Sequence, residues 1–350
     1  MNNLLLLISL TLIPFSCTQT GRVEKYVEIS GETMGTYYRI IYGASENYPD
    51  KGVIDTWLLE LNNSLSTYVD NSVISRFNRS EDGIKASDLD DSLLSKYFFE
   101  NVRISNEIYA ESDGFFDPTV MPLVNYWGFG YDHSQKLTQI DTHLVDSLSQ
   151  FVGLNKLNIG ANPDPEVIKP DHRIELDFSA VAKGYAIDVV SQMLEDSFSI
   201  FNYLVDIGGE SRAKGVNSEG KIWRIGISEP VENSPFSSYK FIVELKDKSI
   251  ATSGNYRNFY ENNGQKISHT MNPKTGFFER NDLLSASILT DDCGYADGYA
   301  TACMAMGFEL AKNMVEKNEK LGAIFIYIDR DNQIKHYISP HIRAFVTPSN

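Results

Sequence analysis

The sequence predicts a protein of the α+β class. Segments with strand-like composition and segments with helical apolar spacing are mixed along the chain, and they do not follow the regular β–α–β alternation of a doubly wound sheet. No internal repeat or low-complexity tract interrupts them. With 350 residues, of which 42% are hydrophobic, the chain can bury a substantial core as one large domain or as two fused lobes.

The elements expected in the first half rest on local composition and spacing. Residues 34–42 are rich in aromatic and β-branched side chains, which predicts a strand. Apolar residues recur at helical spacing over 52–65, and residues 92–110 have a similar pattern, so a helix is predicted at each place. Pro, Asn and Asp are concentrated in residues 158–173, which predicts a loop.

The second half begins with a helix predicted to follow Ser179, whose hydroxyl is a plausible N-cap. A hairpin is predicted over 256–269, with its turn at Asn263 and Gly264. A further helix is predicted from Asp297. Four apolar segments rich in β-branched residues are typical of strands, namely 203–209, 223–227, 241–245 and 324–329.

The N-terminus resembles a bacterial export signal. Its apolar run from Leu4 to Phe15 is too short to anchor a protein stably across a bilayer, and Ser16-Cys17 resembles a lipoprotein cleavage site. We expect residues 1–16 to be a signal peptide and residues 17–30 to be a tether from a lipidated Cys17. The protein would then be exported, anchored to a bacterial membrane and facing the periplasm. Because no Lys or Arg precedes the apolar run, an uncleaved or soluble secretory signal is the alternative.

Charge and cysteine content exclude several classes of protein. The formal net charge of −16 argues against a nucleic-acid binder, since such proteins concentrate Lys and Arg to meet phosphates. An acidic protein that handles a phosphorylated ligand needs a bound cation or local donors. If Cys17 carries lipid, only Cys293 and Cys303 remain, which is too few for a disulfide framework but leaves one bridge open. No Cys/His spacing suggests zinc.

Three polar features are candidates for binding an anion or a metal ion. Asp297 and Thr301 are four residues apart, so their oxygens share one helix face; they either cap and brace the helix or bind a metal ion. Lys183 falls in a first helical turn, where the helix dipole disfavours a cation, so it is either solvated or faces an anion. Gly208 and Gly209 end a strand and either make a tight turn or direct backbone amides at a ligand.

Two further side chains are candidates for ligand contact or proton transfer. Asp117 precedes a proline among aromatic residues, so it either faces a pocket or satisfies buried amides in a core loop. His269 ends the predicted hairpin. A histidine with a pKa near neutrality can take a proton from an incoming hydroxyl group, and a structural role is the alternative.

A series of motifs runs in a fixed order through the chain. They are MGTYYRI (34–40), STY (66–68), SRFN (75–78), DGFFDPTVMPL (113–123), DFSAVAKGYAID (177–188), VDIGGE (205–210), SHTMNPKTG (268–276) and DGYATACMAMG (297–307). Together they cover roughly residues 31–310, and this ordered set resembles the ApbE family of FAD:protein FMN transferases.

The resemblance implies a T-fold-related α+β structure with two closely packed lobes around an FAD cleft, over residues 31–345. It also implies that the FAD diphosphate is cleaved, that FMN is transferred through a phosphoester bond to a Ser or Thr hydroxyl of an acceptor redox protein subunit, and that AMP is released. Two alternatives are a metal-dependent FAD pyrophosphatase that admits water as the acceptor, and a flavin-binding lipoprotein without chemistry.

The resemblance assigns roles to particular residues. Mg²⁺ would be held by Asp297, Thr301 and the backbone carbonyl of Ala180. His269 would be the general base, or alternatively would carry FMN covalently. Asn272 stands where many relatives have Asp, which removes a charge but keeps hydrogen-bonding capacity. The FAD-contacting positions would be Met34, Ser66, Thr67, Tyr68, Asp117 and Lys183, with further contacts from Ser253 and Gly254.

Overall fold

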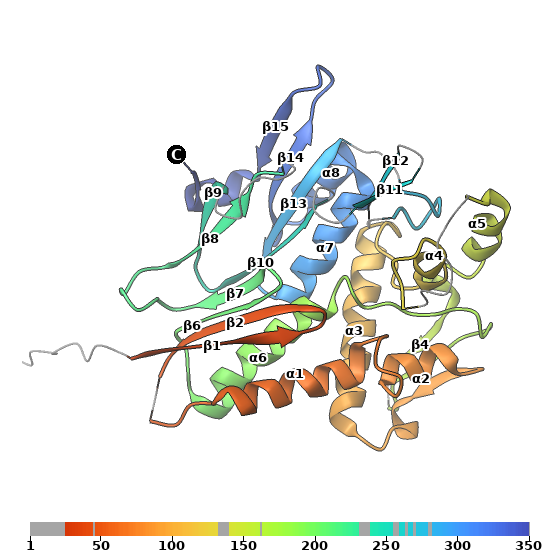
Figure 1. Ribbon diagram of the computed structural model, residues 1–350, viewed down its shortest axis with the longest axis horizontal. Coiled ribbons are helices and arrows are strands. Elements are labelled where there is room, and N and C mark those ends of the chain that lie inside the picture. The colour runs from red at the N-terminus through yellow and green to blue at the C-terminus, as the bar shows by residue number, and fades with distance from the viewer. Residues whose placement is uncertain are drawn as a thin grey trace, which may run out of the picture.

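One large antiparallel sheet organises the fold (Figure 1). The structure, a computed structural model, describes residues 25–44, 46–131, 140–161, 163–230, 239–254, 259–262, 265–268, 271–278 and 282–349. Eight of the described strands form the large sheet, in the spatial order β1-β2-β6-β7-β10-β13-β14-β15. Their bounds are β1 Tyr26–Thr33, β2 Thr36–Gly43, β6 Tyr203–Ile207, β7 Glu210–Lys214, β10 Lys248–Gly254, β13 Leu283–Thr290, β14 Gly322–Ile328 and β15 Ile334–Ile338.

Helices cover one face of the large sheet and a small sheet covers the other. The small sheet has the order β16-β9-β8, with β8 Trp223–Ser228, β9 Tyr239–Leu245 and β16 Val346–Pro348. Side chains from both sheets interleave in one apolar cluster, which includes Trp223, Val243 and Ile324. The described helices are α1 Lys51–Leu65, α2 Val73–Arg79, α3 Ser92–Glu111, α4 Met121–Tyr126, α5 Thr142–Ser149, α6 Ala182–Phe198, α7 Cys293–Met306 and α8 Phe308–Lys317, with 3₁₀ turns at Ala86–Asp88, Leu154–Lys156 and Pro340–Phe345.

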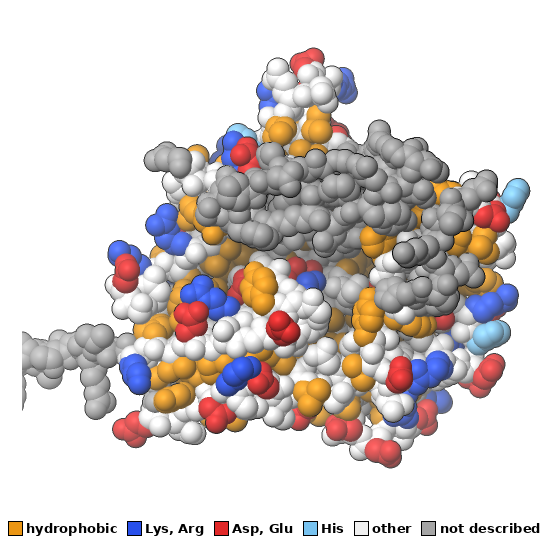
Figure 2. Space-filling view, viewed as in Figure 1, with side chains coloured by type: hydrophobic (Ala, Val, Ile, Leu, Met, Phe, Trp, Pro, Cys, Tyr) orange, Lys and Arg blue, Asp and Glu red, His pale blue; other side chains and the backbone are white. Residues whose placement is uncertain are grey.

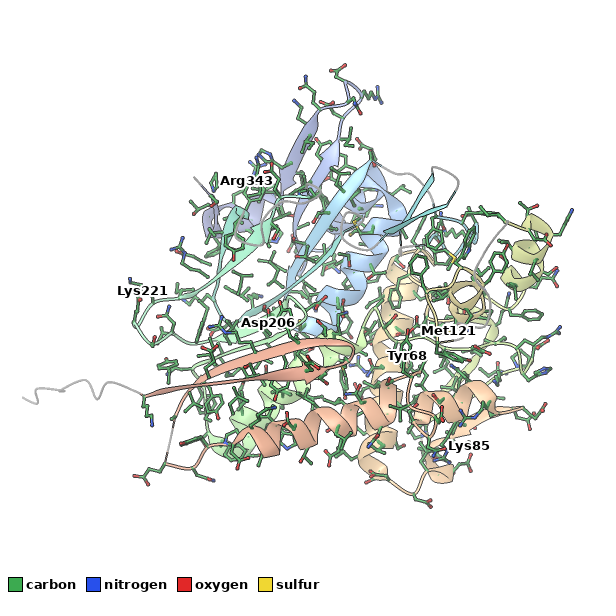
Figure 3. All side chains as sticks on the ribbon, viewed as in Figure 1. Tyr68, Lys85, Met121, Asp206, Lys221 and Arg343 are labelled. Atoms are coloured by element: carbon green, nitrogen blue, oxygen red, sulfur yellow. The ribbon has the colours of Figure 1, made fainter. Side chains whose placement is uncertain are left out.

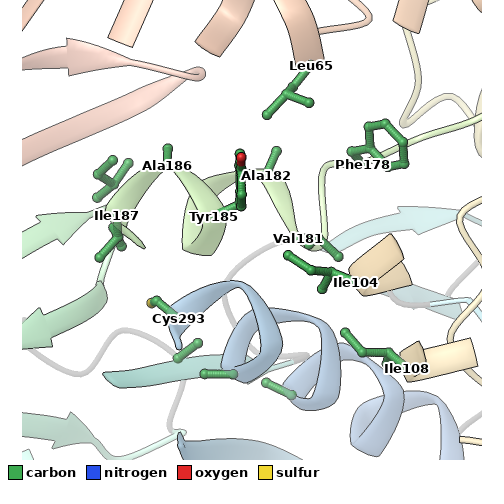
Figure 4. Close-up of a cluster of buried hydrophobic side chains, with 14 of the residues drawn as sticks. Leu65, Ile104, Ile108, Phe178, Val181, Ala182, Tyr185, Ala186, Ile187 and Cys293 are labelled. Atoms are coloured by element: carbon green, nitrogen blue, oxygen red, sulfur yellow. The ribbon is translucent and has the colours of Figure 1, made fainter. Parts of the chain in front are cut away.

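The main core lies where α6 and α7 pack against each other, the sheet and α3 (Figure 4). Small residues on α7 allow this close packing, and Ala296, Ala300 and Cys303 are fully buried. The flanking helices begin at side-chain caps: Asp50 accepts a hydrogen bond from Val53 N, and Asp91 caps α3 in the same way. Local capping and apolar spacing thus define where these helices form, and packing against the sheet sets their arrangement.

A second group of elements lies beside the sheet and its helices. It contains α2, α4, α5 and a short sheet of β3 Gly83–Lys85, β5 Glu166–Ile168 and β4 Asn158–Gly160. Trp127 anchors its apolar cluster and donates a hydrogen bond from its indole N–H to the carbonyl of Gly276. The remaining described strands, β11 Phe259–Asn262 and β12 Gln265–Ser268, pair with each other.

Most expected elements are confirmed, including the α+β class, the helices at 52–65 and 92–110, and the strands at 203–209 and 241–245. The hairpin predicted over 256–269 appears as β11 and β12, while its turn at 263–264 lies outside the described residues. Within the described ranges, no helix is both long enough and apolar enough to cross a membrane.

Several boundaries differ from the sequence prediction. Residues 26–30, assigned to the tether, belong to β1, and β16 extends the folded chain past residue 345. The predicted loop 158–173 contains β4 and β5, because both strands find a partner only in the folded chain. Helix α7 begins at Cys293 rather than at Asp297, so Asp297 lies inside the helix and does not cap it.

The start of α6 also differs from its prediction. Val181 occupies the N-cap position, and no side chain caps this end. The Ser179 hydroxyl instead donates to Asp177, at 2.9 Å. The two buried cysteines, Cys293 and Cys303, are free thiols, so the bridge that the sequence left open does not form.

Candidate active site

A cavity of about 1190 Å³ lies between the two groups of elements. This volume is at or above the upper end of the roughly 300–1,000 Å³ typical of small-molecule pockets. Tyr68 and Met121 line it from the side of α2 and α4, and Asp206 lines it from the side of β6 (Figure 3). The cavity can therefore hold a ligand as large as a dinucleotide.

A lysine held between two buried carboxylates forms the polar wall of the cavity. The Lys183 Nζ atom lies 3.4 Å from Asp297 Oδ2 and 3.6 Å from Glu210 Oε1. Asp297 Oδ2 also accepts a hydrogen bond from Gly184 N, at 3.2 Å. Glu210 Oε2 is buried and has no hydrogen-bond partner among the described residues. The wall thus combines a cation with carboxylate oxygens that are not fully satisfied.

Burial and charge act against each other on this wall. Burial opposes the charged form of Lys183, but the carboxylates of Asp297 and Glu210 outweigh it and raise the lysine pKa. Burial raises the pKa of Glu210, and Lys183 offsets only part of this rise. Lys183 is therefore a stable cation inside the cavity of an acidic protein, as the binding of an anionic ligand requires.

The donors expected for a metal ion line the same cavity. Ala180 lies just before α6, Asp297 and Thr301 lie on α7, and the Thr301 hydroxyl lies 3.3 Å from the Ser253 hydroxyl. The set offers one carboxylate, one hydroxyl and one carbonyl, which are the hard oxygen donors that suit Mg²⁺. Among the described residues, no group of three or more His, Cys, Asp or Glu side chains could hold a metal ion. A magnesium site here would depend on ligand oxygens and water to complete it.

Asp117 lines the cavity, but its carboxylate is already engaged. It accepts hydrogen bonds from the amide and hydroxyl of Thr119 and from Leu154 N. Burial raises its pKa, and these donors offset only part of the rise. The carboxylate therefore satisfies buried amides, as the structural alternative expects, and a contact with FAD stays a prediction.

Three of the other predicted FAD-contacting residues lie in or next to one tight turn. Thr67 and Tyr68 line the cavity, and the Tyr68 side chain is 65% exposed, so its ring is available to a ligand. Ser66 lies outside the lining; its hydroxyl accepts a hydrogen bond from Tyr68 N, and its carbonyl accepts one from Ser72. Met34 packs against the core from the β1–β2 turn and also lies outside the lining.

The predicted base, His269, lies outside the described residues. The turn that follows it is described. Asn272 Oδ1 accepts a hydrogen bond from Lys274 N, and the Asn272 carbonyl accepts one from Gly276 N. The asparagine that departs from the family pattern thus braces its own turn, a role that an aspartate could also perform.

Sequence reasoning did not single out three polar residues in or beside the cavity. Glu210 directly follows the Gly208–Gly209 pair, and an acidic residue at the start of a buried strand was the available signal. Asp177 fixes Ser179 through two hydrogen bonds just before Ala180. Asp188 caps α7 from the neighbouring helix, which no local pattern reveals.

Charges of both signs are scattered over the face in Figure 2, without a continuous basic stripe on the atoms coloured there. The concentrated charge lies inside the cavity. The fold and the site together define an α+β protein with a large cavity, a buried lysine between two carboxylates and a set of oxygen donors.

Comparison with known proteins agrees with this description. Residues 34–325 match the ApbE family. The FAD:protein FMN transferase of Vibrio cholerae is 33% identical over 99% of this chain and 100% of its own length. That of Escherichia coli strain K12 is 32% identical over 91% of this chain and 88% of its own.

Solved structures show the same fold. The flavin transferase ApbE from Vibrio cholerae has a TM-score of 0.80 at 33% identity, covering 92% of this chain and 99% of its own. The apo form of the Pseudomonas stutzeri flavinyl transferase ApbE has a TM-score of 0.78 at 30% identity, and the match covers 92% of this chain and 97% of that one. This chain therefore belongs to the ApbE family.

Proposed function

We propose that this protein transfers FMN from FAD to a Ser or Thr hydroxyl of an acceptor protein and releases AMP. The observation that carries the proposal is the Lys183 ammonium group, held between Asp297 and Glu210 inside a cavity of dinucleotide size. Relatives over nearly the whole chain are named FAD:protein FMN transferase, which supports the same reaction.

The residues of the cavity would bind FAD through two kinds of contact, one ionic and one aromatic. Lys183 would bind the diphosphate, because its ammonium group stays charged beside Asp297 and Glu210 and lines the cavity, where it can form charge-assisted hydrogen bonds to phosphate oxygens. The exposed ring of Tyr68 would pack against a planar ring of FAD, as would that of Phe115, which also lines the cavity. These contacts would hold the diphosphate at the polar wall, where the bond to AMP breaks.

The donor set supports Mg²⁺ as the cation of this reaction. Asp297, Thr301 and the Ala180 carbonyl would hold it, and their hard oxygens fit this ion better than a transition metal. When bound, Mg²⁺ would neutralise diphosphate charge and make the phosphorus more electrophilic. The chain's own residues then have to bring the acceptor hydroxyl close and take its proton, a step that we assign to His269.

The test uses the purified chain from Thr18 onward, incubated with FAD, Mg²⁺ and a redox subunit carrying a flavinylation-type Ser/Thr motif. We expect a mass gain equal to an FMN phosphoester on the acceptor, together with in-gel flavin fluorescence, both dependent on Mg²⁺. Free FMN and AMP in the absence of any acceptor would identify a pyrophosphatase instead. FAD that stays bound and intact under every condition would contradict both enzymatic functions.

We also propose that the protein is exported and anchored to a bacterial membrane, facing the periplasm. The support is the apolar run that ends at Ser16-Cys17, and residues 18–25 would then form the tether before β1. Intact mass of the membrane-extracted protein should show a diacylglycerol-modified N-terminus at Cys17. A mature chain that begins elsewhere, or that is released without detergent, would refute the anchor.

A further inference from the structure

Helix α7, which carries Asp297 and Thr301, has no capping side chain of its own. Asp292 occupies its N-cap position, but its side chain accepts no hydrogen bond from the first turn. The cap comes instead from Asp188 in α6. Asp188 Oδ1 accepts a hydrogen bond from Cys293 N and Asp188 Oδ2 accepts one from Gly294 N, both at 2.8 Å. A carboxylate from one helix therefore satisfies two amides at the start of another.

The same face of α6 makes two other contacts with α7. Gly184 lies one turn before Asp188, so the two residues share a face. A Cβ atom built on Gly184 would lie 2.2 Å from the Cys293 carbonyl oxygen, so only glycine fits at this approach. Gly184 N also donates to Asp297 Oδ2. These contacts fix both the distance between the helices and the position of α7 along α6.

Charge compensation keeps the Asp188 carboxylate in place. Arg212 of β7 lies 2.6 Å from Asp188 and 3.0 Å from Asp292, measured from its Nη1 atom. The positive end of the α7 dipole adds to this stabilisation. A buried carboxylate is costly without such partners, so the arrangement ties α6, β7 and α7 together at one point.

Apart from Glu210 of β7, four residues of the polar wall are divided between these two helices. Ala180 lies just before α6 and Lys183 in its first turn, whereas Asp297 and Thr301 lie on α7. Asp188 is absent from the cavity lining and cannot touch a ligand there. A small shift of α7 along α6 would nevertheless separate the two halves of the wall.

We propose that Asp188 is a positioning residue, which sets the register of α7 on α6 so that the four polar-wall residues face a single bound cation and diphosphate. The proposal rests on the function given above for this cavity. It predicts that ligand affinity, and not only stability, depends on a carboxylate outside the cavity.

The test compares Asp188→Ala with a capping aspartate far from the cavity. Asp91 accepts hydrogen bonds from Leu93 N and Leu94 N at the start of α3, so Asp91→Ala removes an equivalent cap without touching the α6–α7 contact. Isothermal titration calorimetry would measure Mn²⁺ binding in the presence of ADP, which carries a diphosphate but cannot yield FMN. Thermal denaturation would show that each variant is folded at the measuring temperature.

We expect Asp188→Ala to weaken Mn²⁺ affinity at least tenfold and Asp91→Ala to change it less than twofold. Asp188→Asn, which keeps one acceptor oxygen, should fall between them and replaces Asp188→Ala if that variant does not fold. Equal affinities in the Asp188 and Asp91 variants would overturn the proposal, as would a wild-type chain that binds no Mn²⁺. If the wild-type protein binds Mn²⁺ and ADP but forms no FMN product from FAD, the proposed function is wrong, whereas the positioning role of Asp188 is still supported.

Discussion

The contact between Gly184 and the start of α7 gives the most direct test of how the site is built. Substituting Gly184→Ala adds one methyl group, which would lie 2.2 Å from the Cys293 oxygen, 2.6 Å from its carbonyl carbon and 2.8 Å from Gly294 N. All three atoms belong to the backbone and cannot rotate away. Because an ordinary carbon contact needs about 3.5 Å, the two helices have to separate by about 1 Å.

The expected cost follows from this displacement. Overpacking of a well-packed core costs about 1–3 kcal/mol, and replacing a helical glycine by alanine returns about 1 kcal/mol of helix propensity. Since the obstructing atoms are backbone, we expect the upper end of that cost and a net loss of about 2 kcal/mol in the free energy of unfolding. A misplacement of about 1 Å at a reacting centre can cost ~100-fold in rate, so catalysis should suffer more than stability.

The assay is equilibrium unfolding in denaturant, with FAD affinity from flavin fluorescence and FMN formation at saturating FAD. Gly52→Ala is the matched control, because a Cβ there meets no backbone atom and only the Asp50 carboxylate oxygen, at 3.3 Å. That variant should be neutral or slightly more stable and fully active. A Gly184→Ala protein with wild-type stability and FMN formation would refute the close approach and the reasoning built on it.

Three other predictions concern single side chains. Asp297→Ala should abolish Mg²⁺-dependent FMN formation while FAD still binds; unchanged activity in the product assay would remove Asp297 from the metal site. His269→Ala should keep FAD affinity, measured by flavin fluorescence, and lose transfer to the acceptor, and near-normal turnover would exclude the base role. Lys169 is buried and donates to three backbone carbonyls, and burial lowers its pKa to about 8 from 10.5. As pH rises, Lys169 loses its proton in the native state before it does so in the unfolded chain, so the unfolded chain binds more protons between pH 8 and 10.5. The free energy of unfolding of the wild type should therefore rise across that interval, relative to that of Lys169→Met, by roughly 3 kcal/mol. Denaturant titrations at pH 7.5 and pH 10.5 measure the difference, and a pH-independent difference would contradict the lowered pKa.

Local signals predicted the long elements well. Helix α1 buries Ile54, Leu58, Leu61 and Leu65, and this spacing is visible in the sequence. The strands at 203–209 and 241–245 were equally clear, because runs of β-branched and apolar residues mark buried strands. Short or partner-dependent elements were missed: β4 and β5 have three residues each and exist because they pair with each other, and β5 also pairs with β3.

The candidate site was predicted only in part. Lys183, Asp297 and Thr301 were identified from residue type and motif order, and the structure brings all three to one cavity. Met34 and Ser66 also belong to the motif series but lie outside the lining, since a motif residue can set turn geometry instead of contacting a ligand: Met34 has a φ of 50°, and Ser66 braces the turn that carries Tyr68. Asp117 was left undecided between two roles because one of its hydrogen-bond partners, Leu154, is 37 residues away in the chain and becomes a neighbour only after folding.

The sequence by itself determined the α+β class, the main helices and strands, the export signal expected at the N-terminus and the resemblance to the ApbE family. Each of these depends on composition, spacing or motif order, which are properties of neighbouring residues in the chain. Only the tertiary structure decided that Lys183 lies between Asp297 and Glu210, and that Asp188 caps α7 from α6. Such contacts join residues far apart in sequence. Their energies depend on burial and on distances between atoms, and the local sequence pattern contains neither.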